Sequence, residues 1–500
     1  MKRKVSSFVF YIFIFFSILL FFSVIWVNKT FGLINLDSLI FHLNVPLKGT
    51  ESGMIYRYLK DPLLKSIILF IIIVFIFRKK NYEYGIYLKL KFFKKEFNEF
   101  DLINFLSRFK ILISFVLILL SIGYTFKSFG VIGYIKSLAT YSNFVEGHYV
   151  EPENAKIEFS EKRNLIHIFV ESLEYTYADY NNGGAMESNL IPNLVNYANN
   201  NVSFRNDFGG GFFTSRATGW TIAGMVAQTA GIGFIVPGGG NDFGAYSKFL
   251  PGAYSIGDIL NNQGYKQVLL IGSDGDFAGR NDYFMQHGNY EIKDYNYAKK
   301  NKWIDSDYYV WWGYEDSKLF EFAKDELNEL SSGDEPFNLT LLTTNTHHIG
   351  GYLEDSCEAS FDEQFKNVVL CSDKQIYEFV EWIKQQDFYD NTTIVITGDH
   401  LSMDPTFFND IGDYQRSNFN LFINSSVEPV NKNNRLFSSL DIYPTIVASI
   451  GGKIEGDRLG LGTNLFSDKK TLYEEYGLDN VEAELGKNSL YFKNHIIYGK

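Results

Sequence analysis

Three long apolar runs near the N-terminus constrain this chain most, because such runs are stable only in a membrane or a protein core. The first run, 8–27, is broken only by Ser17 and Ser23, and further runs follow at 62–77 and 111–129. A helix of about 20 residues crosses the roughly 30 Å hydrocarbon core of a bilayer. We therefore predict that residues 1–130 form a membrane anchor with about three transmembrane helices.

Basic residues around these runs predict their orientation. The segment 1–4 is Met-Lys-Arg-Lys, and residues 78–110 hold nine Lys and Arg against four acids, which favours the cytoplasmic side for both. A signal peptide is the alternative for the first run, but no small-residue cleavage site follows Val27 and the run is too long. We expect a multi-pass protein of the bacterial inner (cytoplasmic) membrane, with its C-terminal part on the periplasmic or extracellular side.

Charge divides the chain in the same way. Residues 1–130 carry 18 Lys+Arg and 7 Asp+Glu, whereas the rest of the 500 residues carries 28 and 51. The acidic part has no basic cluster, which argues against nucleic acid as a partner. Residues 131–163 are polar and are predicted to be a linker, so the extracytoplasmic domain is expected at 164–500.

Strands and helices alternate in the C-terminal part. Apolar runs predict buried strands at 165–170, 266–271, 337–342, 393–397 and 419–423. Helices are predicted at 221–231, 255–261, 372–383 (with Ser372 as the N-cap) and 440–450. This alternation is typical of an α/β fold with a largely parallel central sheet.

The chain has two cysteines, Cys357 and Cys371, both in the part expected outside the cytoplasm. A disulfide between them would close a loop of about 15 residues and stabilise the fold by roughly 3 kcal/mol. Disulfides persist in oxidising compartments, so we predict this bond. The alternative is a pair of unrelated buried thiols.

Residues suited to chemistry follow four of the predicted strands. These groups are Glu171, Ser172 and Glu174; Asp274, Asp276 and Arg280; Thr343 to His348; and Asp399 with His400. A single acid at a strand end is more often a turn or cap residue. In open α/β sheets, however, ligands bind at the carboxyl ends of the strands. Four such groups at one edge therefore indicate a site, and adjacent Asp399 and His400 can bind a metal ion.

A glycine-rich segment, 209–224, leads into a predicted helix. Free N–H groups and the positive end of the helix dipole suit a phosphate or sulfate there. A threonine hydroxyl at that place can attack phosphorus if a metal lowers its pKa. Thr214, Thr218 and Thr221 are the candidates, and the alternative is that they are caps beside a glycine turn.

Taken together, Glu171, the segment 218–227, the segment 346–348 and Gly398-Asp399-His400 resemble the sulfatase-like branch of the alkaline phosphatase superfamily. More narrowly, the chain resembles the membrane-anchored phosphoglycerol transferases, which include phosphoglycerol transferase I and the lipoteichoic acid synthases. The resemblance covers about residues 160–465.

The resemblance implies one divalent metal bound by Glu171, Asp399 and His400. Mn²⁺ is the expected ion, and Mg²⁺, Ca²⁺ and Zn²⁺ remain alternatives for this mixed ligand set. The resemblance also implies Thr218 as the fourth ligand and the nucleophile. Thr218 is preferred over Thr214 and Thr221 because its distance to Gly231 fits the family helix.

Three more residues are implied to bind substrate. His347 would hold the phosphoglycerol group or protonate the leaving group, with His348 beside it, and Arg280 would contact phosphate. In the lipoteichoic acid enzymes an aromatic residue stands two positions before this arginine, where the present chain has Ala278.

The activity implied is transfer of phosphoglycerol from phosphatidylglycerol to an extracytoplasmic glycan, through a phosphothreonine-type intermediate and with release of diacylglycerol. Anchoring in the bilayer would raise the effective concentration of the lipid donor. The alternatives are a phosphoethanolamine transferase, a metal-dependent phosphodiesterase or sulfatase-like hydrolase, and a non-catalytic glycan-binding protein. Formylglycine-type sulfatase activity is disfavoured because the chain has no Cys/Ser-x-Pro-x-Arg motif.

Overall fold

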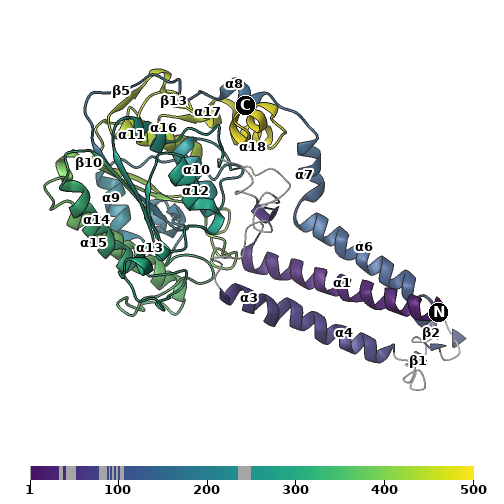
Figure 1. Cartoon of the computed structure of the whole chain (residues 1–500). Coiled ribbons are helices and arrows are strands. Elements are labelled where there is room, and N and C mark those ends of the chain that lie inside the picture. Colours follow the sequence, from purple (N-terminus) through teal and green to yellow (C-terminus); the bar gives the residue numbers. More distant parts are fainter. Residues whose placement is uncertain are drawn as a thin grey trace. The chain divides into compact units, whose positions relative to one another are not determined.

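The computed structural model describes residues 2–32, 36, 38–40, 52–77, 106–234 and 249–500, with short strand pieces between 87 and 101. The chain forms two compact units. The first unit comprises residues 1–36 and 51–135, and the second comprises 37–50 and 136–500 (Figure 1).

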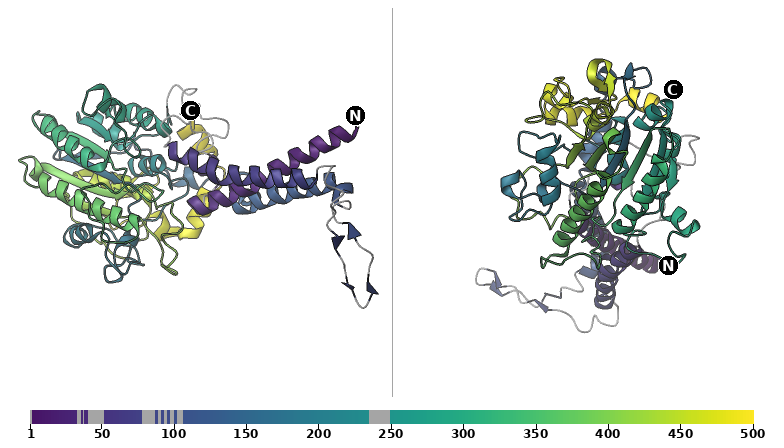
Figure 2. Two further views of the ribbon diagram at one scale, coloured as in Figure 1. Left: turned by 90° about the horizontal axis from the view of Figure 1, so that it is seen from below. Right: turned by 90° about the vertical axis from the view of Figure 1, so that its left-hand side faces the viewer.

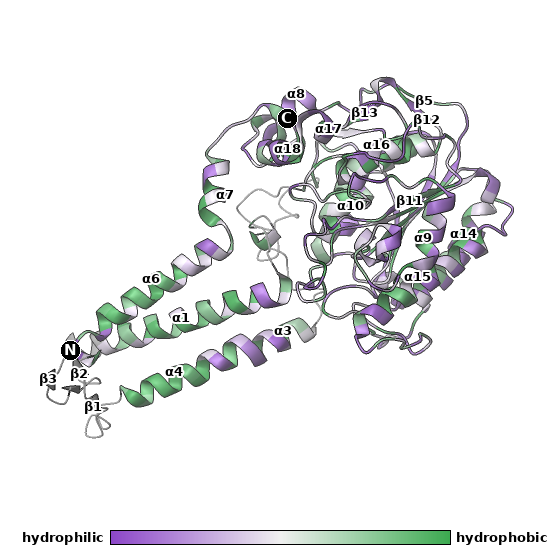
Figure 3. Ribbon diagram, turned by 180° about the vertical axis from the view of Figure 1, so that it is seen from behind, coloured by the Kyte–Doolittle hydropathy of each residue, from purple (hydrophilic) through white to green (hydrophobic). Residues whose placement is uncertain are grey.

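Apolar helices make up most of the first unit. Among its described residues, α1 (Lys2–Phe31) and α6 (Lys110–Ser128) are long and apolar enough to cross a membrane. The predicted run 62–77 forms α4 (Leu64–Ile76), which follows α3 (Ser52–Tyr58) and the π-helix η1 (Leu59–Leu63). Figure 3 shows that hydrophobic residues dominate α1, α4 and α6. Short antiparallel pairs lie between α4 and α6: β1 (Tyr87–Leu88) with β4 (Phe100–Asp101), and β2 (Lys91–Phe92) with β3 (Lys95–Glu96).

A few polar contacts join α1 to α6. The hydroxyls of Ser17 and Ser121 lie 2.8 Å apart in a buried position. Asn28 Nδ2 donates to the Ser128 hydroxyl over 3.2 Å. Hydrogen bonds between helices in apolar surroundings are worth roughly 1 kcal/mol each and fix which residues face one another.

A six-stranded sheet forms the centre of the second unit, in the order β11-β10-β6-β9-β7-β8. Five strands are parallel: β6 (Asn164–Val170), β7 (Lys266–Ile271), β8 (Glu291–Lys293), β9 (Phe337–Leu342) and β10 (Thr392–Gly398). The edge strand β11 (Asn420–Ile423) runs antiparallel to β10. The predicted α/β fold with a largely parallel sheet is confirmed.

Helices cover both faces of this sheet (Figures 1 and 2). Side chains from β6 alternate between the faces: Ile166 and Ile168 pack with α9 (Pro192–Asn200), α14 (Asp316–Ser331) and α15 (Gln364–Ile383). The opposite face packs with α10 (Thr221–Ala230), α11 (Ile256–Asn262) and α16 (Ser439–Ser449). Because both faces are covered, every residue of β6, β9 and β10 is buried.

Shorter elements complete the second unit. They are α8 (Phe144–His148), β5 (Ile157–Phe159), η3 (Tyr175–Tyr177), η4 (Tyr180–Asn182), η5 (Phe277–Gly279), α12 (Arg280–Gln286), α13 (Tyr295–Lys300), η6 (Tyr389–Asn391), β12 (Gly452–Ile454), η7 (Glu455–Asp457), β13 (Arg458–Leu459), β14 (Gly462–Thr463), α17 (Leu472–Tyr476), α18 (Leu478–Leu485) and η8 (Phe492–Ile497). Helix α7 (Val131–Leu138) spans the boundary between the two units.

The structure differs from the sequence prediction at two places. Most of the predicted linker 131–163 belongs to the second unit, because β5 pairs with β12 and its apolar residues pack against the core. Helix α15 begins at Gln364, so Ser372 is a buried residue inside the helix and not its N-cap. Apolar residues at helical spacing, Phe365 and Val368 among them, extend the buried face toward the N-terminus. The predicted disulfide is present: Cys357 and Cys371 are bonded, with their Cα atoms 5.7 Å apart.

Candidate metal centre and nucleophile

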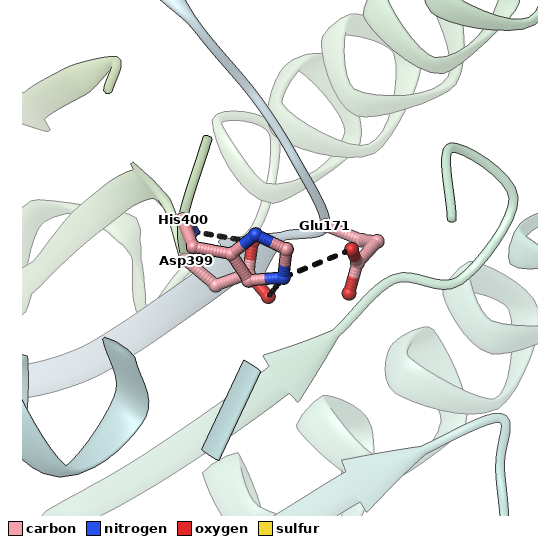
Figure 4. A group of neighbouring side chains, drawn as sticks. All are labelled: Glu171, Asp399 and His400. Carbon is pink, nitrogen blue, oxygen red and sulfur yellow. Dashed lines mark hydrogen bonds and ion pairs between the residues drawn. The ribbon is translucent and has the colours of Figure 1, made fainter. Parts of the chain in front are cut away.

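Glu171, Asp399 and His400 come together at the carboxyl edge of the sheet (Figure 4). The strands β6 and β10 are parallel neighbours in which Val170 pairs with Gly398, so the residues that follow each strand are adjacent. One potential ligand atom from each of the three side chains lies within 4.8 Å of the others, and all three residues are buried. The structure thus brings these predicted residues into one cluster.

Hydrogen bonds orient the ligand atoms of this cluster. Asp399 Oδ1 accepts from the backbone N–H groups of Ser172 and His400, both at 2.7 Å, while Oδ2 has no hydrogen-bond partner in the described part of the chain. His400 Nδ1 lies 2.8 Å from the carbonyl of Leu401, so this nitrogen carries a proton. His400 Nε2 is then the nitrogen that faces the cluster, 3.3 Å from Glu171 Oε1 and 3.5 Å from Asp399 Oδ2. A ring whose other nitrogen donates to a carbonyl is typical of metal-binding histidines.

The charges in the cluster favour a cation. Burial and the neighbouring Glu171 raise the pKa of Asp399 to about 8. Burial opposes the charge on Glu171, but His347 and His400 lower its pKa overall. Burial also opposes the charge on His400, yet the two carboxylates raise its pKa to about 10. Two buried carboxylates, one free oxygen and one imidazole nitrogen therefore fit a divalent ion such as Mn²⁺, Mg²⁺ or Zn²⁺.

The hydroxyl of Thr221 lies beside this cluster. Its Oγ1 is 3.2 Å from Glu171 Oε2, to which it donates, and 3.4 Å from His400 Nε2. Thr221 is the first residue of α10, directly after the extended residue Trp220. The first turn of a helix presents unpaired N–H groups and a positive dipole end, which attract an anion. The Thr221 hydroxyl, the candidate metal ligands and the N-terminus of α10, which suits an anion, therefore lie next to one another.

Thr218, the predicted nucleophile and fourth ligand, has other partners. Its hydroxyl donates to the carbonyl of Ser215 at 2.7 Å and accepts from the hydroxyl of Ser439 at 3.0 Å. Thr214 accepts from Asn418 Nδ2 at 3.0 Å. The Thr218 hydroxyl therefore satisfies polar groups of the turn before α10, and the role predicted for Thr218 stays a prediction. Among the three threonines, the contacts to Glu171 and His400 are those of Thr221.

Helix α10 rests directly on the turn that carries Asp399. A Cβ atom on Gly224 would lie 2.0 Å from the carbonyl oxygen of Asp399, so only glycine permits this approach. Gln228 Nε2, one turn further along the helix, donates to the carbonyl of Gly398 at 2.9 Å. These contacts fix the distance between α10 and the Asp399 turn, and with it the position of Thr221 relative to the cluster.

Arg280 and His347 lie within electrostatic range of Glu171. The buried Arg280 donates from Nη2 to the carbonyl of Asp274 at 2.8 Å, and its Nε has no partner among the residues that the structure describes. Burial lowers the pKa of Arg280 to about 10, with Glu171 among the acids that oppose this change, so the guanidinium stays charged at neutral pH. His347 Nδ1 lies 2.6 Å from the carbonyl of His348, which leaves Nε2 as its acceptor atom.

The other predicted substrate residue, His348, is placed differently. Its Nδ1 lies 3.9 Å from Asp404 Oδ2, in the loop that follows His400. The structure therefore groups His348 with that loop, and the unpartnered donor near the cluster is Arg280.

Sequence reasoning missed Trp312. Its ring lies 4.4 Å from the ring of His347 and 5.8 Å from that of Phe277, between centroids. Its indole N–H is buried and finds no partner within the described ranges. Burial lowers the pKa of His347, and Trp312 covers this ring. The aromatic run 308–312 was a visible signal, but nothing in the sequence linked it to His347.

Two buried acids, Glu174 and Asp316, hold the loops around the cluster in place. Glu174 accepts from Arg416 Nε at 2.9 Å and from the backbone N–H of Ser402 at 2.8 Å, which ties the loop after Glu171 to the loop after His400. Asp316 accepts from the backbone N–H groups of Thr344 and Asn345, at 2.7 and 3.1 Å, in the loop that leads to His347.

Comparison with known proteins gives a family and a fold. The family model described as Sulfatase matches residues 163–452. Phosphoglycerol transferase I from Xanthomonas campestris pv. campestris (strain B100) is 33% identical over 314 residues, which cover 61% of this chain and 43% of the relative. Phosphoglycerol transferase I from Escherichia fergusonii is 32% identical over 330 residues, covering 64% and 41%. The chain thus spans about two fifths of the length of the curated relatives it matches.

A solved structure, that of the lipoteichoic acid synthase LtaP from Listeria monocytogenes, superposes with a TM-score of 0.50 at 19% identity. The superposition covers 65% of this chain and 80% of that one, which shows a shared fold. The Sulfatase model itself spans more than half of the present sequence. The chain therefore belongs to the sulfatase family.

Proposed function

We propose that this protein transfers phosphoglycerol from phosphatidylglycerol to an extracytoplasmic glycan and releases diacylglycerol. The observation that carries the proposal is the Thr221 hydroxyl at the start of α10, within hydrogen-bonding distance of Glu171. A nucleophile at that position serves transfer through a covalent enzyme intermediate. The name of the curated relatives, phosphoglycerol transferase I, supports the head group that is moved.

The N-terminal unit supports a lipid donor. Its helices α1 and α6 are each long and apolar enough for a membrane span. We assign the unit as the anchor in the bacterial inner membrane, with residues 164–500 on the periplasmic or extracellular face. A bilayer confines the donor lipid, and an anchored enzyme meets it at a high effective concentration.

Glu171, Asp399 and His400 would hold a divalent metal, Mn²⁺ by preference, with the Thr221 oxygen next to them. When bound, the metal would supply positive charge that stabilises the developing negative charge on the phosphoryl group. Arg280 adds a second positive charge, and its unpartnered Nε is free to donate to a phosphate oxygen. Preorganised donors of this kind usually make the largest contribution to lowering the barrier.

In the first step, Thr221 Oγ1 attacks phosphorus and the bond from phosphorus to the diacylglycerol oxygen breaks. The hydrogen bond to Glu171 Oε2 orients the threonine hydroxyl, so that an oxygen lone pair is available for attack. The proton that Thr221 loses ends on the departing diacylglycerol oxygen. Phosphoglycerol is then esterified to Thr221.

In the second step, a hydroxyl of the acceptor glycan attacks the same phosphorus and the bond to Thr221 Oγ1 breaks. Because His347 Nδ1 donates to the carbonyl of His348, its Nε2 is the lone-pair nitrogen that accepts the proton of the glycan hydroxyl. The proton passes on to Thr221 Oγ1 and restores the starting state. Over the two steps the protein takes up and releases no net proton.

Turnover with defined lipids tests the proposal. The full-length protein in detergent micelles with Mn²⁺ should release diacylglycerol from phosphatidylglycerol and not from phosphatidylethanolamine, and an added glycan should receive phosphoglycerol. Preference for phosphatidylethanolamine would identify a phosphoethanolamine transferase. Release of glycerol phosphate with the glycan unmodified would identify a phosphodiesterase, and the absence of any release would favour a glycan-binding protein.

A further inference from the structure

A polar groove of about 630 Å³ lies on the second unit. Six asparagines contribute to its lining: Asn181, Asn182, Asn199, Asn206, Asn433 and Asn434. Small-molecule sites measure about 300–1,000 Å³, so the groove has room for an oligosaccharide. No role in the metal chemistry explains it, since none of its lining residues belongs to the cluster around Glu171.

The lining indicates a ligand rich in hydroxyl groups. Among the described lining residues, Ala198 is the only apolar side chain, so the groove does not suit an acyl chain. A carboxamide presents a donor and an acceptor side by side, which matches two adjacent hydroxyls of a sugar ring. Asn182 and Asn206 bond within the protein, so the candidates for this contact are Asn181, Asn199, Asn433 and Asn434. Arg205 and Lys432 add positively charged donors, and Asp207 adds a negatively charged acceptor.

Two exposed aromatic rings are neighbours of the lining in the sequence. Tyr180 directly precedes Asn181, and Phe208 lies between the lining residues Asp207 and Gly209. Their side chains are 63% and 58% exposed. The apolar C–H face of a sugar is a suitable partner for an exposed amphipathic or apolar ring of this kind.

The walls of the groove are already fixed. The Arg205 guanidinium lies 3.7 Å above the ring of Tyr175, and Nη1 donates to the carbonyl of Gly209 at 2.8 Å. Asn206 Oδ1 accepts from the backbone N–H groups of Phe208 and Gly210, at 2.8 and 3.1 Å. Binding to a preformed groove loses little conformational entropy, which favours affinity.

We propose that this groove binds the saccharide chain of the acceptor glycan. Its wall at 205–209 continues along the glycine-rich segment directly to Thr221, so one stretch of chain carries both the groove and the nucleophile. The identity of the saccharide as the acceptor rests on the proposed function. Saccharide binding itself is a separate property and is measured separately.

The test measures binding of neutral trisaccharides of glucose, galactose, mannose and N-acetylglucosamine to the full-length Thr221→Ala variant by titration calorimetry in detergent. We expect at least one to bind, and Tyr180→Ala with Phe208→Ala to weaken it at least tenfold. Tyr141→Ala is the matched control, because Tyr141 is 64% exposed and lies outside the groove. Asn181→Ala with Asn433→Ala should weaken binding, whereas Asn328→Ala on α14 should not.

Three results would overturn the inference: no trisaccharide binds, the groove variants bind as well as the controls, or inorganic phosphate displaces the sugar. Equal melting temperatures of the variants show that folding is intact. With Thr221 intact, the Tyr180 and Phe208 substitutions should leave the first-turnover release of diacylglycerol, measured without glycan, unchanged and should reduce transfer to the glycan. Loss of all diacylglycerol release in the parent protein would instead overturn the proposed function and leave the binding result standing.

Discussion

Gly224→Ala should inactivate the protein, although it adds only one methyl group. The new Cβ would lie 2.0 Å from the carbonyl oxygen of Asp399 and 2.8 Å from its carbonyl carbon. Because Cβ atoms essentially never come closer than 3.0 Å to such atoms, α10 and the Asp399 turn must separate by about 1 Å. Thr221 lies one turn before Gly224 and moves with the helix.

The expected magnitude follows from this displacement. A misplacement of about 1 Å can cost on the order of 10²-fold in rate. Overpacking costs about 1–3 kcal/mol in free energy of unfolding, and the higher helix propensity of alanine returns about 1 kcal/mol. We therefore expect a loss of at most about 2 kcal/mol in stability beside a far larger fall in activity.

The assay compares diacylglycerol release and melting temperature. Gly219→Ala is the control, because its Cβ would meet only Thr214 Cγ2, at an ordinary 3.4 Å, and activity should stay within about threefold. If Gly224→Ala kept full activity and stability, the contact between α10 and Asp399 would not determine the position of Thr221. Thr221 would then not need its observed position for activity.

Four further predictions concern the same site. Thr221→Ala should abolish diacylglycerol release, whereas Thr218→Ala should keep turnover and lose about 1–3 kcal/mol of stability with its two hydrogen bonds. Trp312→Ala should admit water to His347, whose pKa burial holds below the usual 6.5, so the acidic limb of the pH–rate profile should move up toward 6.5. Arg416→Ala leaves its carboxylate partner buried and unpaired and should lower the free energy of unfolding by about 3 kcal/mol, measured in urea. EDTA should abolish turnover and lower the melting temperature, because an ion that binds only the folded protein stabilises it, and Mn²⁺ should reverse both effects.

The candidate metal cluster could be predicted because its residues follow recognisable strands, and these strands are parallel neighbours in the sheet. Glu171 and Asp399 each follow a buried strand that is mostly apolar or β-branched, and parallel pairing of β6 with β10 makes their positions adjacent. The order of strands in the sheet was not visible in the sequence, but any order that pairs these two strands gives the same cluster. Local pattern was therefore sufficient for this part of the site.

The proposed nucleophile, Thr221, could not be chosen from the sequence pattern. Three threonines, Thr214, Thr218 and Thr221, precede or begin the same helix, and the residue at the N-cap is Trp220, which makes no side-chain cap hydrogen bond. The usual cap residues therefore gave no signal for the start of α10. Only the partners of the three hydroxyls distinguish them, and these partners come from distant parts of the chain.

Long-range contacts also explain why other residues or their contacts were not predicted. Glu174 and Arg416 are 242 positions apart and meet only in the folded chain. Trp312 reaches His347 from a turn that the sequence connects to no strand-end motif. Such pairs depend on packing between loops, which neither periodicity nor composition describes.

The identity of the covalent intermediate tests the central claim most directly. The full-length protein is incubated with Mn²⁺ and phosphatidylglycerol labelled in its head group, without glycan, then quenched in acid and digested for mass spectrometry. The peptide that contains residues 214–221 should carry one phosphoglycerol group, and fragmentation should place it on Thr221. Modification of Thr218 or Thr214, or continued release of diacylglycerol without any labelled peptide, would contradict the proposed mechanism.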